Sequence, residues 1–105
     1  MLTEKDYCNN DITVVLEELG FPIRRIKVKG KEKNIPILLY EAQMWLREER
    51  GILLQPTYLE LSDEWICVIH DKNKRHGYST QKQKDYEETL FEGIKEVVKI
   101  LKEEK

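Results

Sequence analysis

Apolar side chains recur with the period of an α-helix in three segments of the sequence, which predicts three helices. Gly20 can adopt the left-handed conformation that ends the first helix, and Pro22 prevents its continuation. Gly51 ends the second helix, and Asp85 with Glu88 caps the start of the third. The apolar positions are Cys8, Ile12, Val15, Leu16 and Leu19 in the first helix, Leu38, Leu39, Ala42, Trp45 and Leu46 in the second, and Tyr86, Leu90, Phe91, Ile94, Val97, Val98 and Leu101 in the third.

The first helix has two candidate starts. Thr3 with Asp6 favours an early start, because both residue types cap helix N-termini. Asn10 or Asp11 favours a shorter helix. The end is better defined, since Phe21 can fold back on the helix as a Schellman motif requires.

Alternation of apolar and polar residues predicts strands between these helices. In residues 24–29, Ile26 and Val28 lie on one face and cations on the other, which indicates a half-buried strand with a cationic outer face. Residues 30–34 are polar and begin with glycine, so they are predicted to form a turn or loop. Residues 71–84 are polar and basic and contain Gly77, and we expect a long loop there.

The segments 52–61 and 65–70 are predicted to be strands that pair as an antiparallel hairpin through a turn at Ser62 and Asp63. Pro56 lacks a backbone N–H and indicates a sheet edge or a bulge. The second strand is apolar on both faces, so we expect it to be interior or covered, with Trp65 largely buried. The predicted order is therefore α-β-α-β-β-α over a single domain of residues 1–105. The fold class is α+β, with helices packed on one face of a small, mainly antiparallel sheet.

Composition places this fold in a reduced intracellular setting. The 105 residues include 36% charged residues and carry a net charge of −2, which favours neither nucleic acid nor a membrane. The chain holds two cysteines and no run near the ~18 apolar residues of a membrane span. The N-terminus, Met-Leu-Thr-Glu-Lys-Asp, holds no apolar signal region, and we expect a cytoplasmic protein.

Charge is concentrated in blocks. Residues 22–36 carry six cations against Glu32 alone, and residues 72–84 carry five cations and no acid. Cations at alternate strand positions lie about 7 Å apart, close to the spacing of phosphates along a nucleic-acid strand, and Tyr78 could stack on a base. Exposed lysines also protect sheet edges from aggregation, so a purely structural role stays open. The candidate nucleic-acid-binding residues are Arg25, Lys27, Lys29, Lys72, Lys74 and Arg75.

No pattern of residues indicates a catalytic, cofactor or metal site. Cys67 and His70 are three apart on a strand and point to opposite faces, and the spacing to His76 is not one that zinc sites use. Cys67 lies among apolar residues, which raise a thiol pKa, and Cys8 has acidic neighbours in the sequence. Gly30-Lys31 lacks the earlier glycine of a phosphate-binding loop, because that position is Arg25. We expect a protein that is not an enzyme.

Three stretches together resemble a family of small uncharacterised proteins of bacterial prophages and other mobile elements. They are Leu16-Glu17-Glu18-Leu19-Gly20-Phe21, Leu39-Tyr40-Glu41-Ala42-Gln43-Met44-Trp45-Leu46-Arg47-Glu48 and Tyr86-Glu87-Glu88-Thr89-Leu90-Phe91-Glu92-Gly93-Ile94. Thr89 stands where this family more often has alanine. The resemblance implies a mobile-element origin and supplies no reaction.

Elimination of these chemistries leaves a non-catalytic protein-interaction or accessory module, which binds an unknown protein partner or self-associates. The alternative is a nucleic-acid-binding accessory protein that uses the basic segments 24–33 and 72–84.

Overall fold

The computed structural model describes residues 7–74 and 76–103, and it confirms the α+β class. Within these residues the order is α-β-β-α-β-β-β-α, so two short strands join those that the sequence predicted. The elements are α1 (Asn10–Glu18), β1 (Arg25–Val28), β2 (Lys31–Asn34), α2 (Leu39–Arg50), β3 (Ile52–Leu59), β4 (Glu64–Asp71), β5 (His76–Ser79) and α3 (Tyr86–Glu103).

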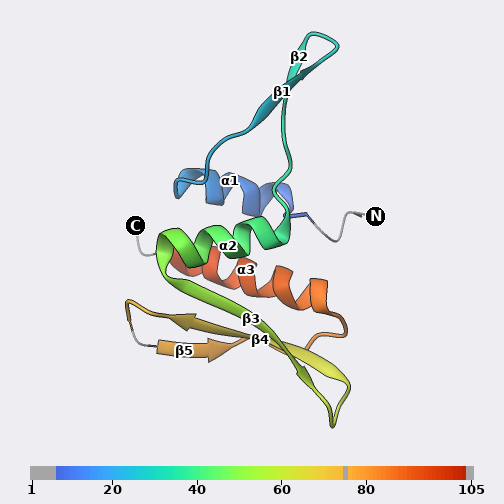
Figure 1. Ribbon diagram of the computed structural model, residues 1–105, viewed down its shortest axis with the longest axis vertical. Helices are drawn as coiled ribbons and strands as arrows, with labels where there is room; N and C mark the ends of the chain where they lie inside the picture. The colour runs from blue at the N-terminus through green and yellow to red at the C-terminus, as the bar shows by residue number, and fades with distance from the viewer. Residues whose placement is uncertain (1–6, 75, 104–105) are drawn as a thin grey trace.

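The strands form two separate antiparallel sheets, one of β1 and β2 and one in the order β3-β4-β5. Helices α2 and α3 pack side by side on one face of the three-stranded sheet, as predicted, and α1 contacts α3 from the side away from that sheet (Figure 1). The β1–β2 hairpin projects beyond α1, at the opposite end of the long axis from the three-stranded sheet (Figure 1). The molecule extends 52 Å along this axis.

Local capping signals determine where the helices begin and end. The Asn9 side chain accepts a hydrogen bond of 2.9 Å from the N–H of Ile12, so α1 takes the shorter of its two predicted forms. At its end, Phe21 N–H donates to Leu16 O at 2.9 Å around Gly20, which has φ +117°, in the predicted Schellman arrangement.

The other two helices also follow their predicted limits. Gly51, with φ 67°, ends α2, and the Asp85 carboxylate accepts a hydrogen bond of 2.7 Å from the N–H of Glu88 at the start of α3. Of the helices described, none is long and apolar enough to span a membrane.

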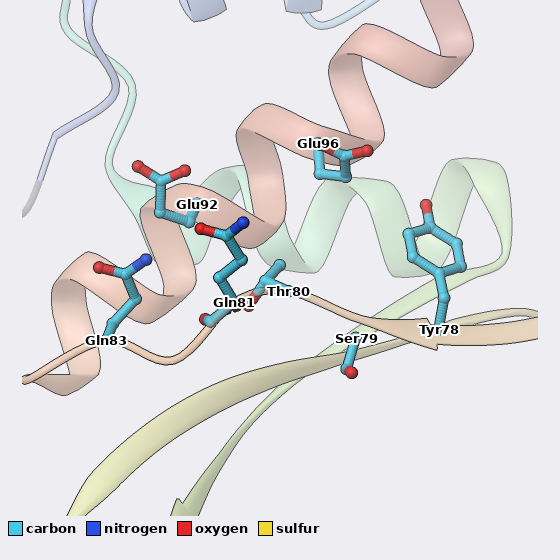
Figure 2. A pocket seen from close by; sticks show the side chains of 7 residues that line it. All are labelled: Tyr78, Ser79, Thr80, Gln81, Gln83, Glu92 and Glu96. Atoms are coloured by element: carbon cyan, nitrogen blue, oxygen red, sulfur yellow. Dashed lines mark hydrogen bonds between the residues drawn. The ribbon is translucent and has the colours of Figure 1, made fainter.

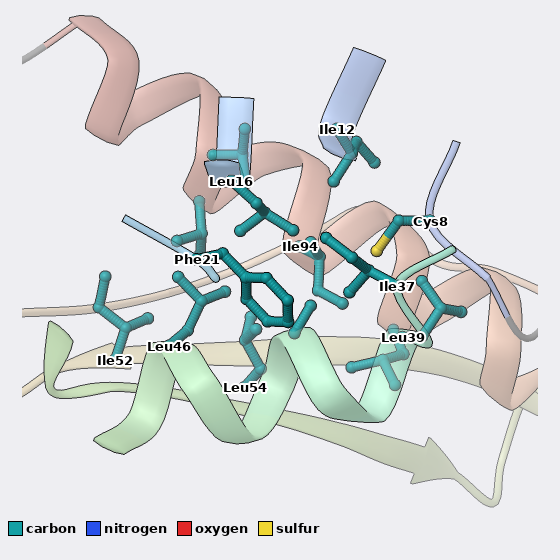
Figure 3. Close-up of a cluster of buried hydrophobic side chains, with 14 of the residues drawn as sticks. Cys8, Ile12, Leu16, Phe21, Ile37, Leu39, Leu46, Ile52, Leu54 and Ile94 are labelled. Atoms are coloured by element: carbon teal, nitrogen blue, oxygen red, sulfur yellow. The ribbon is translucent and has the colours of Figure 1, made fainter. Parts of the chain in front are cut away.

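The core lies between the α2–α3 layer and the three-stranded sheet and continues between that layer and α1 (Figure 3). Leu16, Leu46, Ile69 and Ile94 are fully buried in it. Gly93 lets α3 pack directly on β4, because a Cβ at this position would lie 3.1 Å from Cys67 Cβ and closer still to its sulfur. The apolar stripes of α2 and α3 therefore face the sheet that they cover.

The β3–β4 hairpin is confirmed, with pairing from Ile52 and Asp71 to Leu59 and Glu64. Trp65 is largely buried, as predicted, and lies beside the rings of Tyr58 and Tyr86, whose centroids are 5.3 and 5.5 Å away. Near this end of the sheet, neighbouring aromatic rings rather than the main core cover the indole.

Candidate functional site

The projecting hairpin is built by a two-residue turn. Lys29 and Gly30 have φ of 52° and 79°, and positive φ at both central residues is the mark of a type I′ turn. Lys31 therefore pairs at once with Val28, and the ladder continues to the bond of 2.8 Å from Ile35 N–H to Arg24 O. The prediction of a loop over residues 30–34 was wrong, because this turn reverses the chain without further residues.

Neither face of the hairpin is covered by any residue that the structure describes. The side chains of Ile26 and Val28 are 48% and 37% exposed, and every residue of β1 is exposed. The prediction of a half-buried strand was wrong, because the described helices and the larger sheet all lie beyond the root of the hairpin (Figure 1).

Cross-strand pairing gives the hairpin two unlike faces, since directly opposite residues share a face. Ile26 pairs with Lys33 and Val28 with Lys31, and these four residues form what we call the mixed face. Arg25, Lys27 and Glu32 lie on the other side, which we call the charged face, and Arg25 Nη1 lies 3.7 Å from Glu32 Oε2.

The five candidate nucleic-acid-binding residues that the structure describes do not form one surface. Arg25 and Lys27 lie on the charged face and Lys29 in the turn. Lys72 and Lys74 lie in the turn after β4, while Arg75 is outside the described residues. The layer of helices separates this turn from the hairpin (Figure 1).

Arg24 fixes the root of the hairpin to α2. Its Nη1 and Nη2 donate to the two carboxylate oxygens of Glu41 at 2.7 and 3.1 Å, and Nη2 also donates to Pro36 O at 3.1 Å. Glu41 Oε1 accepts a further bond of 3.1 Å from the N–H of Leu38. Burial raises the pKa of Glu41, but the bonds from Arg24 and Leu38 and the charge of Arg24 outweigh it, so the net pKa is lowered.

Both cysteines are buried and free. Burial, followed by the nearby charge of Glu41, raises the pKa of Cys8 to about 12. Burial raises the pKa of Cys67 to about 11, as its strand position predicted, against a weaker lowering by a backbone hydrogen bond from Gln55. His70 is exposed while Cys67 is buried, so the two lie on opposite faces of β4. Among the described residues, no three potential metal ligands cluster.

A groove that the sequence did not predict lies between β5 and α3, with a volume of about 310 Å³. Tyr78, Thr80 and Gln81 point from the strand segment toward the helix, and Glu92 and Glu96 project from α3 (Figure 2). Gln83 and Ser79 complete this β5–α3 groove. The groove was not predicted, because residues 71–84 were interpreted as a loop. The sequence does carry a strand signal there, since Tyr78 and Thr80 alternate with smaller residues.

The β5 edge beside this groove is open. Thr80 N–H donates to Cys67 O at 3.0 Å, so Thr80 and Cys67 are a hydrogen-bonded pair of the β4–β5 ladder. This bond fixes the phase of the ladder, that is, which residue pairs are hydrogen-bonded and which are not. The alternation of an antiparallel ladder then directs the backbone groups of Gly77 and Ser79 outward. Within the described residues no strand pairs with this edge.

The β3 edge is blocked. Pro56, which has no N–H, lies at an outward position of this strand, so the predicted edge location is confirmed. The phase follows from the bond of 3.0 Å between Lys72 N–H and Gly51 O. The Gln43 side chain donates to the outward carbonyl of Leu54 at 2.7 Å. The sheet therefore has one open and one protected edge.

Comparison of the chain with protein-family models, curated proteins and solved structures gave no match. The hairpin and the β5–α3 groove are thus the features from which a function can be proposed.

Proposed function

We propose that this domain is a non-catalytic protein-interaction module whose binding arm is the β1–β2 hairpin. The observation that supports this proposal is the mixed face, where Ile26 and Val28 are exposed and no neighbouring segment among the described residues covers them. An isolated two-stranded hairpin is marginally stable in water, so a partner that covers this face would also stabilise the arm. An origin in a bacterial mobile element and a cytoplasmic location belong to the same proposal and rest on the sequence.

The mixed face also defines the chemistry of its partner. Lys31 and Lys33 lie directly across from Val28 and Ile26, so the two aliphatic side chains share their face with two ammonium groups. A complementary surface would hold a small apolar area beside carboxylates. The contact area of a hairpin with two four-residue strands is small, which suits a transient complex or one of several contacts.

Nucleic-acid binding is the second candidate, and one observation favours it. A projecting two-stranded ribbon fits the major groove of DNA, and Arg25 and Lys27 lie on its charged face. The ion pair between Arg25 and Glu32 weakens this candidate, because an acidic side chain stands among the cations that would meet phosphate.

Two matched double variants separate these candidates. The mixed-face variant is Ile26→Ser with Val28→Ser, and the charged-face variant is Arg25→Ser with Lys27→Ser. Tagged parent and variant proteins would be used to capture partners from host lysate with and without nuclease, followed by mass spectrometry and affinity measurement with each purified partner. We expect a nuclease-resistant protein partner whose affinity falls for the mixed-face variant and stays close to the parent value for the charged-face variant.

The opposite pattern would support the second candidate. Partners that nuclease removes, and that the charged-face variant loses, would identify nucleic acid as the ligand. In that case the slope of log affinity against log salt should decrease by about two for the charged-face variant, one for each lost phosphate contact.

A further inference from the structure

We propose that the mixed face of the hairpin docks in the β5–α3 groove of a second copy of this chain, by strand addition at the open β5 edge. This inference rests on the proposed function, because it names the partner of the same hairpin face.

The backbone groups at the two edges match. On β5 the outward residues are Gly77 and Ser79. In the hairpin, the bond from Ile35 N–H to Arg24 O fixes the phase, so Glu32 and Asn34 direct their backbone groups outward from β2. Each edge thus presents N–H and C=O groups from residues two apart, as an added antiparallel strand requires.

The phase of the two ladders decides which face of the hairpin meets α3. The Ser79 side chain points away from α3, whereas Tyr78 and Thr80 point toward it (Figure 2). Strand addition places outward residues opposite outward residues, and opposite residues share a face. Glu32 must then point away from α3 like Ser79, so the mixed face points toward the helix. The same holds if β1 is the added strand, because its outward residues are Arg25 and Lys27 of the charged face.

The charges in the groove fit this orientation. Glu92 and Glu96 are one turn apart on α3, where side chains lie about 5–6 Å from each other. Lys31 and Lys33 are two apart on β2, which separates them by about 7 Å. The described lining of the groove contains these two carboxylates and no cation, and the Tyr78 ring offers an apolar surface for Ile26 and Val28. Groove and hairpin are therefore complementary in spacing, sign and polarity.

A second copy must supply the hairpin. Within one molecule the layer of helices lies between the hairpin and the three-stranded sheet, so the arm does not reach its own groove (Figure 1). The β3 edge is no alternative acceptor, because Pro56 lacks a donor there and Gln43 occupies the carbonyl of Leu54. Two copies that exchange hairpins form a closed two-fold pair, and a one-way exchange forms an open head-to-tail chain.

A charge-swap experiment tests the contact. The hairpin variant is Lys31→Glu with Lys33→Glu, and the groove variant is Glu92→Lys with Glu96→Lys. Sedimentation equilibrium of the parent should show self-association that weakens as salt is raised, because salt screens the ion pairs. Each variant alone should self-associate at least about 10-fold more weakly, since it places like charges together. An equimolar mixture should recover a complex of the two variants, because every hairpin then meets a groove of opposite charge.

The matched control is Arg25→Glu with Lys27→Glu, which makes the same change of charge on the charged face. Its self-association should stay within about 3-fold of the parent value, because these side chains point away from α3 and contribute only at long range. Circular dichroism of every variant verifies that the fold is kept.

Three results would overturn the inference: a parent that stays monomeric at all concentrations up to about millimolar, where even weak complexes form; a control that loses as much affinity as the hairpin variant; or a mixture without recovery. The proposed function has a separate readout. Suppose that the parent is monomeric, that it binds a nuclease-resistant protein partner, and that the variant Ile26→Ser with Val28→Ser does not bind this partner. The inference of a second copy would then be refuted, and the proposed interaction module would be retained.

Discussion

The two hairpins of this molecule share a backbone pattern and differ in what surrounds them. In β3–β4, eight-residue strands lie under α2 and α3, and inward side chains such as Leu54 and Ile69 are buried. In β1–β2, four-residue strands project into solvent, and Ile26 and Val28 are exposed. Alternation of apolar and polar residues creates two faces in both hairpins, but only a covering helix turns an apolar face into core. The uncovered face is available for a partner.

Removing the cover of the packed hairpin should have the largest effect on stability. Ile94 of α3 is fully buried in the core. We expect Ile94→Ala to lower the free energy of unfolding by about 2–5 kcal/mol through lost burial and a cavity, measured by urea denaturation. A loss below about 0.5 kcal/mol, typical of surface sites, would mean that α3 is not packed into the core that covers β3–β4.

Forcing α3 away from the β3–β4 hairpin should have the next largest effect on the free energy of unfolding. Gly93→Ala introduces a Cβ against the Cys67 side chain, and both positions are buried in a closely packed region. We expect a loss of about 1–3 kcal/mol from overpacking, read from the midpoint of thermal or urea unfolding. Gly30→Ala at the hairpin turn is a useful contrast, because a Cβ there meets no atom within 4 Å and only the positive φ opposes it. If Gly93→Ala lowered the free energy of unfolding no more than Gly30→Ala does, the close packing of α3 on β4 would be contradicted.

The root of the projecting hairpin should contribute less. Arg24 and Glu41 are about one-third exposed, so solvent screens the pair, and we expect Glu41→Gln to cost about 0.5–1 kcal/mol. Because the pKa of Glu41 is lowered in the folded state, its contribution is present above the usual value of 4.5 and is lost as pH falls through the folded-state pKa. The difference in stability between parent and variant should therefore shrink below pH 4.5. A difference independent of pH would show that the charge of Glu41 does not hold the hairpin.

The smallest effect is expected on the hairpin itself. Ile26→Ser with Val28→Ser removes two large apolar side chains, yet the free energy of unfolding should change by less than about 0.5 kcal/mol, because neither is packed against the body. A single change of the same kind in the packed hairpin, Ile69→Ser, should cost several-fold more. If the double variant destabilised the monomer by about as much as Ile94→Ala, the hairpin would be part of the core.

Features with strong local signals could be predicted from the sequence. Gly20 and Phe21 end α1, and Asp85 begins α3, through hydrogen bonds between residues close in the chain. The long β3–β4 hairpin was also predictable, because its strands are rich in apolar residues.

The short strands carried no such signal. β2 is Lys-Glu-Lys-Asn without an apolar residue, and its turn begins with Lys29 where Asn or Gly is usual. β5 is four residues long and includes Gly77, which strands disfavour. The groove exists because β5 lies beside α3, so it could not be predicted without that strand. Exposure of the first hairpin was equally hidden, because it depends on where the rest of the chain packs.

Pro56 and Gln43 make the two edges of the three-stranded sheet unequal in their ability to accept a further strand. On the β3 side, Pro56 has no N–H to donate and the carbonyl of Leu54 already accepts from Gln43, so of the two described edges the β5 edge is the better suited to strand addition. An obstructed edge of this kind opposes continuous edge-to-edge pairing of identical sheets, which growth of a fibril requires. The fold thus limits uncontrolled pairing at one edge while the described residues leave the other edge unpaired.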